Sequence, residues 1–185
     1  MVDSIENIIE GCRRKKPQAQ RLLYEKYSAQ MFGVCLRYAG SKEDAQDILH
    51  EGFLKIFEKI GQFEARGSFE GWIRKIMVNT ALEKYRSQYK TVRMEDDKRE
   101  YDKYTSEDFT DSITVSELLL MIRELSPQYR IVFNMYAIEG YSHKEISELL
   151  HISEGTSKSN LSRARYILQE KVKNYYNYKQ TIRIG

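Results

Sequence analysis

Residues 141–173, YSHKEISELLHISEGTSKSNLSRARYILQEKVK, carry the strongest structural signal in the chain. Ser142 and Glu145 have the spacing of a capping box, which predicts the start of a short helix. The tripeptide HIS that follows predicts a tight turn, and its Ser153 can cap a second helix. The predicted buried faces are Ile146, Leu149 and Leu150 in the first helix, and Leu161, Ala164, Ile167 and Leu168 in the second. A short helix, a three-residue turn and a longer polar helix form a helix-turn-helix.

The outward face of the second helix is predicted to be basic and polar. Its members are Lys158, Ser159, Asn160, Arg163 and Arg165. Side chains near the start of such a helix can reach base edges, while later cations meet phosphates. The alternative is a solvated face on a purely structural helix hairpin. The turn and the basic face together favour DNA binding.

Two positions depart from the general helix-turn-helix pattern. His151 occupies the turn position usually given to glycine, although histidine tolerates the left-handed backbone better than most residues. Ser157 stands where an inward-facing valine is expected.

Composition supports a mostly helical protein with one ordinary domain or two small ones. The 185 residues are 41% hydrophobic and 31% charged, with two prolines. The net charge of +3 is small, so any affinity for nucleic acid must come from local clusters of charge. Cys12 and Cys35 fit no metal or CxxC spacing, which favours free buried thiols in a reducing cytoplasm over a disulfide. With no signal peptide and no apolar run that could span a bilayer, we expect a cytoplasmic protein.

Helical periodicity covers the chain on both sides of one interruption. Four helices are predicted in the first part: before Pro17, from Pro17 to Gly40, from Ser41 to near Gly61, and from Phe69 to Tyr89. The segment YKTVRMEDDKREYDKYTSEDFTDS (89–112) has few aliphatic residues and no periodicity. We therefore expect an all-α fold of two helical domains, 1–90 and 114–178, with a flexible linker at 91–113 and a tail at 179–185.

The fourth predicted helix combines basic and aromatic residues. Its predicted exterior carries Arg74, Lys75, Lys84, Arg86 and Lys90 against Glu83 alone, while Phe63, Phe69 and Trp72 lie before or at its start, with Arg66 between them. Cations follow a phosphate backbone and aromatic rings stack on unpaired bases, so the pattern indicates contact with opened DNA. The alternative places Phe69 and Trp72 in the core.

The third predicted helix begins with an acidic strip. Asp44, Asp47 and Glu51 lie there together with His50, and part of this charge favours the helix dipole. Asp47 and His50 could share a metal ion, but the second such pair and the further glutamates of a di-metal bundle are missing from the sequence. The strip is better suited to a protein partner.

Three segments together resemble one family, the extracytoplasmic-function (ECF) sigma factors of bacterial RNA polymerase. DAQDILHEGFLKIF (44–57) resembles its segment that docks on the polymerase clamp helices. GSFEGWIRKIMVNTALEKYR (67–86) resembles the segment that opens the promoter and reads the −10 element. LSPQYRIVFNMYAIEGYSHKEISELLHISEGTSKSNLSRAR (125–165) resembles the domain that reads the −35 element.

The resemblance implies a role for each set of residues. It implies docking on core polymerase by Asp44, Asp47, Ile48, His50, Glu51 and Phe53. It implies −10 contacts by Gln62, Phe63, Arg66, Ser68, Phe69, Trp72, Arg74, Lys75 and Asn79, and −35 contacts by Lys158, Ser159, Asn160, Arg163 and Arg165. The linker would thread toward the polymerase active-site cleft, where its acidic stretch EDD (95–97) could occupy a nucleic-acid path. An anti-sigma factor is an expected further partner, and no catalytic residue, metal or cofactor is expected.

The chain departs from the family pattern at His50, where a glutamine is common, at Asn160, where many members carry arginine, and at Ser157. The −35 preference of other members therefore does not transfer. The leading alternative function is a transcriptional regulator with a sensory or dimerising helical domain, although such a domain needs no basic, aromatic-led helix. An enzyme is the third class, but the sequence has no nucleophile triad, phosphate loop or metal cluster to support it.

Overall fold

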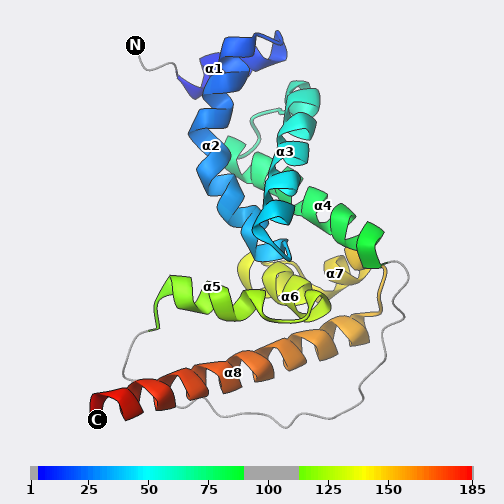
Figure 1. Ribbon diagram of the computed structural model, residues 1–185. Coiled ribbons are helices and arrows are strands. Elements are labelled where there is room, and N and C mark those ends of the chain that lie inside the picture. Colours follow the sequence, from blue (N-terminus) through cyan, green and yellow to red (C-terminus); the bar gives the residue numbers. More distant parts are fainter. Residues whose placement is uncertain (1–3, 90–112, 185) are drawn as a thin grey trace. The chain divides into compact units, whose positions relative to one another are not determined.

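A computed structural model describes residues 4–89 and 113–184, and every regular element within these ranges is a helix (Figure 1). The chain divides into two compact units, one before and one after residues 90–112. The predicted all-α class is confirmed. Most of the expected linker, including its acidic stretch at 95–97, lies outside the described residues. In the part of the chain that the structure covers, no helix is both long enough and apolar enough to span a membrane.

The N-terminal unit is a helical bundle. It consists of α1 (Ile5–Arg13), α2 (Pro17–Tyr38), α3 (Lys42–Lys59), the short 3-10 helix η1 (Ile60–Gln62) and α4 (Phe69–Tyr89). Helices α2, α3 and α4 pack against one another, and α1 packs on α2 and reaches η1 (Figure 1). Side chains from all four α-helices fill the core between them.

Local sequence signals set the ends of these helices. The Ser41 hydroxyl accepts a hydrogen bond from the Asp44 N–H at 3.0 Å and caps α3, as predicted. Pro17 begins α2, where its missing N–H leaves no hydrogen bond unmade.

Both cysteines belong to the core of this unit. Cys12 and Cys35 are buried free thiols. Burial raises the pKa of the Cys12 thiol to about 11 and that of the Cys35 thiol to about 12. Because the thiolate is the reactive form and these raised pKa values keep both groups protonated near neutral pH, the two thiols serve as packing groups.

The C-terminal unit contains the helix-turn-helix. Its elements are α5 (Val115–Arg123), α6 (Pro127–Phe133), the π-helical turn η2 (Asn134–Ile138), α7 (His143–Leu150) and α8 (Glu154–Ile184). Helices α5, α6 and α7 all pack on α8. The sequence predicts one regular helix from Ser126 to Gly140, but its second half is π-helical. Helix α8 continues through Ile184, beyond residue 178, where we expected the domain to end.

Capping boxes start two helices of this unit, α5 and α7, and the one at Ser142 and Glu145 confirms the prediction. The Glu117 N–H donates to the Thr114 hydroxyl at 3.3 Å, and the Thr114 N–H donates to the Glu117 carboxylate at 2.9 Å. Ser142 and Glu145 make the same reciprocal pair at 3.2 and 2.8 Å. Ser126 lies at the N-cap of α6 but its side chain makes no capping hydrogen bond.

The core of the C-terminal unit lies between α5, α6 and α8. Its buried members are Ile122, Leu125, Ala164 and Leu168, with Leu118, Met121, Tyr129, Phe133 and Ile167 packed against them. Two polar contacts also join these helices: Lys171 pairs with Glu124 at 2.5 Å, and the Tyr175 hydroxyl donates to Glu117. The second helix of the helix-turn-helix, α8, is thereby anchored to the helices that precede the motif.

Candidate functional site

The outer face of α3 carries an acidic strip with an apolar end. Asp47, His50 and Glu51 are exposed and Asp44 is half-buried, and all four were predicted to be available to a partner. Leu54 follows them at helical spacing and is 64% exposed. We call these five residues the docking strip. Among the described residues, no three His, Cys, Asp or Glu side chains are placed to hold a metal ion.

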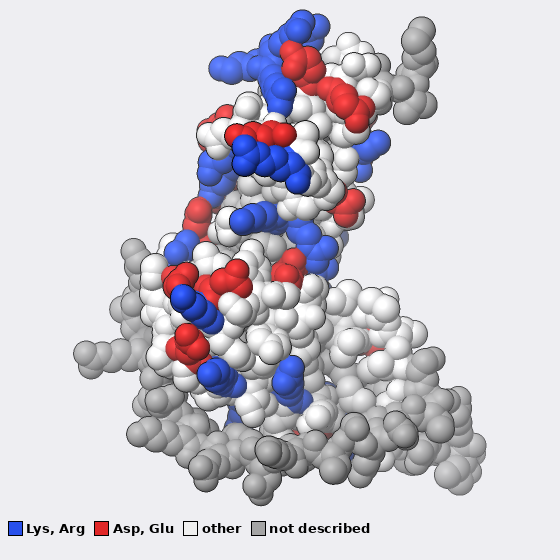
Figure 2. Space-filling view, turned by 180° about the vertical axis from the view of Figure 1, so that it is seen from behind, with Lys and Arg blue, Asp and Glu red and all other residues white. Residues whose placement is uncertain are grey.

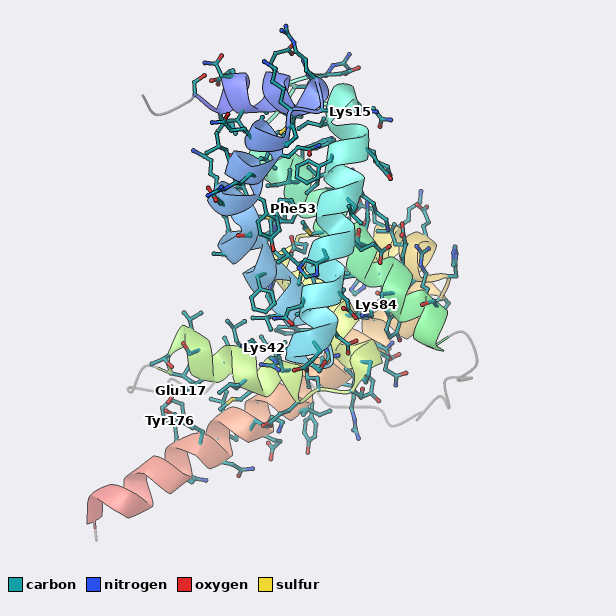
Figure 3. All side chains as sticks on the ribbon, turned by 45° about the horizontal axis from the view of Figure 1, so that its top comes forward. Lys15, Lys42, Phe53, Lys84, Glu117 and Tyr176 are labelled. Carbon is teal, nitrogen blue, oxygen red and sulfur yellow. The ribbon has the colours of Figure 1, made fainter. Side chains whose placement is uncertain are left out.

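Two of the residues predicted to dock on polymerase lie in the core instead. Ile48 is 3% exposed and Phe53 is 2% exposed. Figure 3 shows Phe53 between α3 and α2, where its ring centroid lies 4.6 Å from that of Tyr24. Both residues fall on the stripe of α3 that packs against its neighbours, so Ile48 and Phe53 support the docking strip from beneath and do not form its surface. Leu54 was missed, although its position off that stripe could have revealed it.

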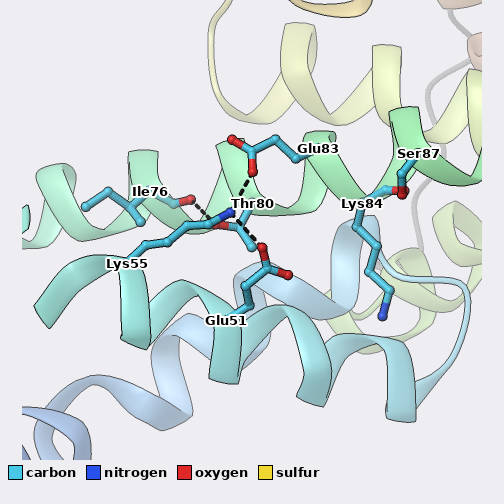
Figure 4. Close-up of polar contacts among 7 residues, drawn as sticks. All are labelled: Glu51, Lys55, Ile76, Thr80, Glu83, Lys84 and Ser87. Atoms are coloured by element: carbon cyan, nitrogen blue, oxygen red, sulfur yellow. Dashed lines mark hydrogen bonds and ion pairs between the residues drawn. The ribbon is translucent and has the colours of Figure 1, made fainter. Parts of the chain in front are cut away.

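Lysines from the same unit compensate part of the strip's charge. The Lys84 ammonium lies 3.1 Å from Asp44 and 3.0 Å from Asp47. The Lys55 ammonium lies 2.7 Å from Glu51 and 2.5 Å from Glu83 (Figure 4). Burial lowers the pKa of Lys84, but the hydrogen bonds to Asp47 and Asp44 outweigh burial and raise it overall. Lys84 was expected on a basic exterior of α4, yet it serves the charge balance of α3.

An aromatic cluster lies at the start of α4. The Phe63 ring contacts the Phe69 ring edge-on, with centroids 5.1 Å apart, and its centroid lies 5.6 Å from that of Trp72. The Phe69 and Trp72 rings are stacked, with centroids 5.7 Å apart. Phe69 is only 7% exposed and also contacts Tyr27, so the ring belongs to the core, which is the alternative that the sequence left open for it. Phe63 and Trp72 are half-buried and rest on it. The structure thus divides the cluster into one supporting ring and two partly open rings.

The loop before α4 presents polar groups to solvent. Gln62, Arg66 and Ser68 are exposed, as expected of residues that contact DNA. The Ser68 hydroxyl accepts a hydrogen bond from the Gly71 N–H at 3.0 Å, which caps the start of α4. Arg66 pairs with Glu64 at 2.9 Å.

Helix α1 holds this loop from the other side. The Arg13 guanidinium donates to the Phe63 carbonyl oxygen at 2.6 Å. Sequence reasoning missed Arg13, because the two residues are 50 positions apart and no local pattern joins them.

The outward side of α4 is moderately basic. Lys75 is exposed, while Arg74 and Asn79 are half-buried. Figure 2 shows one face of the molecule, where lysine and arginine side chains lie among aspartate and glutamate side chains. This mixture agrees with the small net charge of +3 and means that short clusters determine where an anion can bind.

The helix-turn-helix accommodates both residues that depart from the general pattern, His151 in the turn and Ser157 in α8. His151 has φ 56° and ψ 44°, the left-handed conformation that the turn requires. Ser157 is fully buried and its hydroxyl shares a 2.9 Å hydrogen bond with Nδ1 of His143. The buried hydroxyl therefore has a partner, and the bond ties α7 to α8.

A stacked pair extends from this bond to the surface. The His143 and Tyr136 ring centroids lie 4.6 Å apart, and the Arg165 guanidinium lies over the Tyr136 ring, 5.7 Å from its centroid. Burial, and then the positive charge of Lys158, lower the pKa of His143.

The first turns of α8 expose a short basic and polar face. Lys158, Ser159 and Arg165 are exposed, and Arg163 is half-buried with its guanidinium 5.8 Å from the Tyr166 ring centroid. Asn160 is 6% exposed, so its predicted outward position is wrong. It lies three residues after buried Ser157 and next to Leu161, at the edge of the inner face of α8.

Comparison with known proteins agrees with this arrangement. Residues 23–91 match the family model described as Sigma-70 region 2, and residues 116–168 match that described as Sigma-70, region 4. The chain is 29% identical over 154 residues to the ECF RNA polymerase sigma factor SigE of Mycolicibacterium smegmatis, a match that covers 80% of this chain and 59% of SigE. It is 27% identical over 177 residues to the ECF RNA polymerase sigma-E factor of Haemophilus influenzae, a match that covers 89% of this chain and 93% of the sigma-E factor.

A solved structure shares the fold. It is the sigma factor RpoE in complex with the anti-sigma factor NepR from Bartonella quintana, with a TM-score of 0.50 and 20% sequence identity. The alignment covers 83% of this chain and 96% of that one.

Proposed function

Because the chain belongs to the ECF group of the sigma-70 family, we propose that it binds core RNA polymerase, directs it to specific promoters and helps to open the −10 DNA. The observation that carries this function is the pairing of two unlike faces within the N-terminal unit. Helix α3 presents an acidic strip ending in exposed Leu54, while the start of α4 presents partly open rings among polar side chains. A protein-docking face and a base-capturing face thus lie on adjacent helices.

We assign each surface one step of initiation. The docking strip binds the polymerase clamp helices. Unpaired −10 bases and nearby DNA contact Gln62, Phe63, Arg66, Ser68, Trp72, Arg74, Lys75 and Asn79, with Phe69 as the ring that supports them. The −35 duplex contacts Lys158, Ser159, Arg163 and Arg165. Docking and melting fall within residues 1–90 and −35 recognition within 114–178, with 91–113 as linker and 179–185 as tail.

This work needs no catalytic residue and no cofactor. A protein that binds unpaired bases more tightly than paired ones shifts the duplex toward the open state by its differential affinity alone. Aromatic stacking contributes about 1–3 kcal/mol per base, which is of the same order as the cost of unstacking. We place the protein in the cytoplasm with core polymerase. Because the solved RpoE was captured with an anti-sigma factor, we include such an inhibitor among this chain's partners.

The test is capture of core RNA polymerase by the purified chain, followed by transcription from fragmented genomic DNA. We expect core-dependent initiation at a discrete set of start sites, which would also give both promoter elements. Failure to bind core, together with tight binding of the chain alone to duplex DNA, would instead support the regulator.

A matched variant tests base capture. Trp72→Ala should leave core binding intact and lower the opening of a double-stranded promoter, because a partly open stacking ring is lost. Opening at the wild-type rate would contradict the role assigned to Trp72.

A further inference from the structure

We infer that Lys84 determines how tightly the docking strip binds polymerase, by competing for its carboxylates from within the same domain. This inference rests on the proposed function, since polymerase is the partner whose cations would meet the strip. Lys84 lies on α4 and reaches across to α3, and Figure 3 shows it beside that helix. It stands outside every set of residues assigned above to polymerase or DNA.

The geometry places Lys84 inside the strip rather than beside it. Its ammonium is 3.1 Å from one carboxylate oxygen of Asp44 and 3.0 Å from one of Asp47. Both of these partners are members of the docking strip. The Asp47 side chain is still 72% exposed, so it faces an incoming partner while a positive charge already lies against it.

Lys55 differs from Lys84 in a way that sharpens the assignment. Lys55 pairs with Glu51 of the strip at 2.7 Å, but also with Glu83 of α4 at 2.5 Å (Figure 4). If a partner takes Glu51, Glu83 still compensates the lysine. Both partners of Lys84 belong to the strip, so a cation that takes Asp44 and Asp47 must displace it or bear its repulsion.

Charge considerations set the sign and the size of the effect. A partner that recognises carboxylates carries positive charge, and a like charge placed at the contact weakens the association. The ion pairs of Lys84 lie at the surface of the domain, with the Lys84 side chain 21% exposed and that of Asp47 72% exposed, and surface pairs contribute little to the stability of the free domain. Removing Lys84 therefore costs the free domain little. From the range measured for surface pairs, about 0.2–1 kcal/mol each, two such contacts correspond to a roughly two- to thirtyfold change in affinity.

The experiment measures the dissociation constant for core polymerase of the full chain carrying Lys84→Gln. We expect binding about two- to thirtyfold tighter than wild type at low salt, with the gain shrinking as salt screens the charges. Lys59→Gln is the matched control, because Lys59 is exposed at the far end of α3 and its loss changes net charge equally. That control should shift the constant by less than twofold.

Two outcomes would overturn the inference. One is a Lys84→Gln chain that melts like wild type but binds core no more tightly, or less tightly, which would make Lys84 a positioning group for the carboxylates. The other is the same gain in an Asp44→Asn, Asp47→Asn background, where there is nothing left for Lys84 to compete for. The proposed function is judged separately, by whether the wild-type chain binds core at all.

Discussion

Replacing Leu54 with alanine should weaken binding to core polymerase while leaving the free chain as stable as wild type. Leu54 is 64% exposed, so it contributes little to the core of the free domain. Burying a whole leucine side chain is worth about 1.5–3 kcal/mol, and roughly two-thirds of this surface remains to be buried on docking. Truncation should then cost about 1–2 kcal/mol of binding free energy, which corresponds to a roughly 5- to 30-fold larger dissociation constant.

Phe53→Ala is the contrasting variant, because the neighbouring residue is buried instead of exposed. Phe53 is 2% exposed and packs against Tyr24, so its truncation should cost about 3–5 kcal/mol of folding free energy. The assays are titration of the labelled chain with core polymerase and urea unfolding of the same samples. If Leu54→Ala bound core with wild-type affinity, Leu54 would not belong to the docking strip. A fully stable Phe53→Ala chain would refute the assignment of that ring to the core.

Three further predictions follow from single contacts. Gly11→Ala should lower the free energy of unfolding by about 1–3 kcal/mol, since the added methyl group would stand 2.5 Å from a side-chain carbon of α2; an unchanged melting temperature would contradict this. Arg13→Met should slow promoter opening several-fold with core binding unchanged, because the loop loses its hydrogen bond at the Phe63 carbonyl, whereas Arg14→Met should not; equal rates for the two variants would show that the bond does not matter. The pKa of His143 is lowered in the folded chain, so the unfolded chain binds a proton at this histidine more readily than the folded chain does. The stabilisation that neutral His143 gives the folded state is therefore present above about pH 6.5 and is lost as the pH falls below that value. Urea unfolding between pH 5 and 8 should therefore show a shallower pH dependence in His143→Gln than in wild type, and identical slopes would refute the assignment.

Helix ends could be predicted from the sequence because capping is local. Thr114 with Glu117, and Ser142 with Glu145, close their hydrogen bonds within three residues, so their spacing alone identifies them. The left-handed His151 was also predictable, because few residues tolerate that conformation and the turn demands it.

The faces of helices were predictable only away from their edges. Adjacent positions on a helix differ by about 100° around its axis, so Leu54 turns outward directly after Phe53 turns inward. Periodicity within α3 places Phe53 on the inner stripe and leaves Leu54 off it, but the ring that Phe53 meets on α2 lies outside any local pattern. The contacts of Lys84 and Arg13 were beyond reach for a related reason, since each joins segments at least 37 residues apart.

The interior of the helix-turn-helix shows how one polar contact can fix the candidate DNA-reading face. Ser157 points inward, where its hydroxyl meets His143, and this bond adds to the packing of Leu161, Ala164 and Leu168 that sets the rotation of α8 about its own axis. With Ser157 inward, helical spacing carries Asn160 to the inner side and leaves Lys158 and Ser159 outward. A valine at position 157 would fill the same place without the bond to α7, so its rotation would depend on packing alone. The preference of this protein at the −35 element should therefore depend on His143 as well as on the side chains that face the duplex.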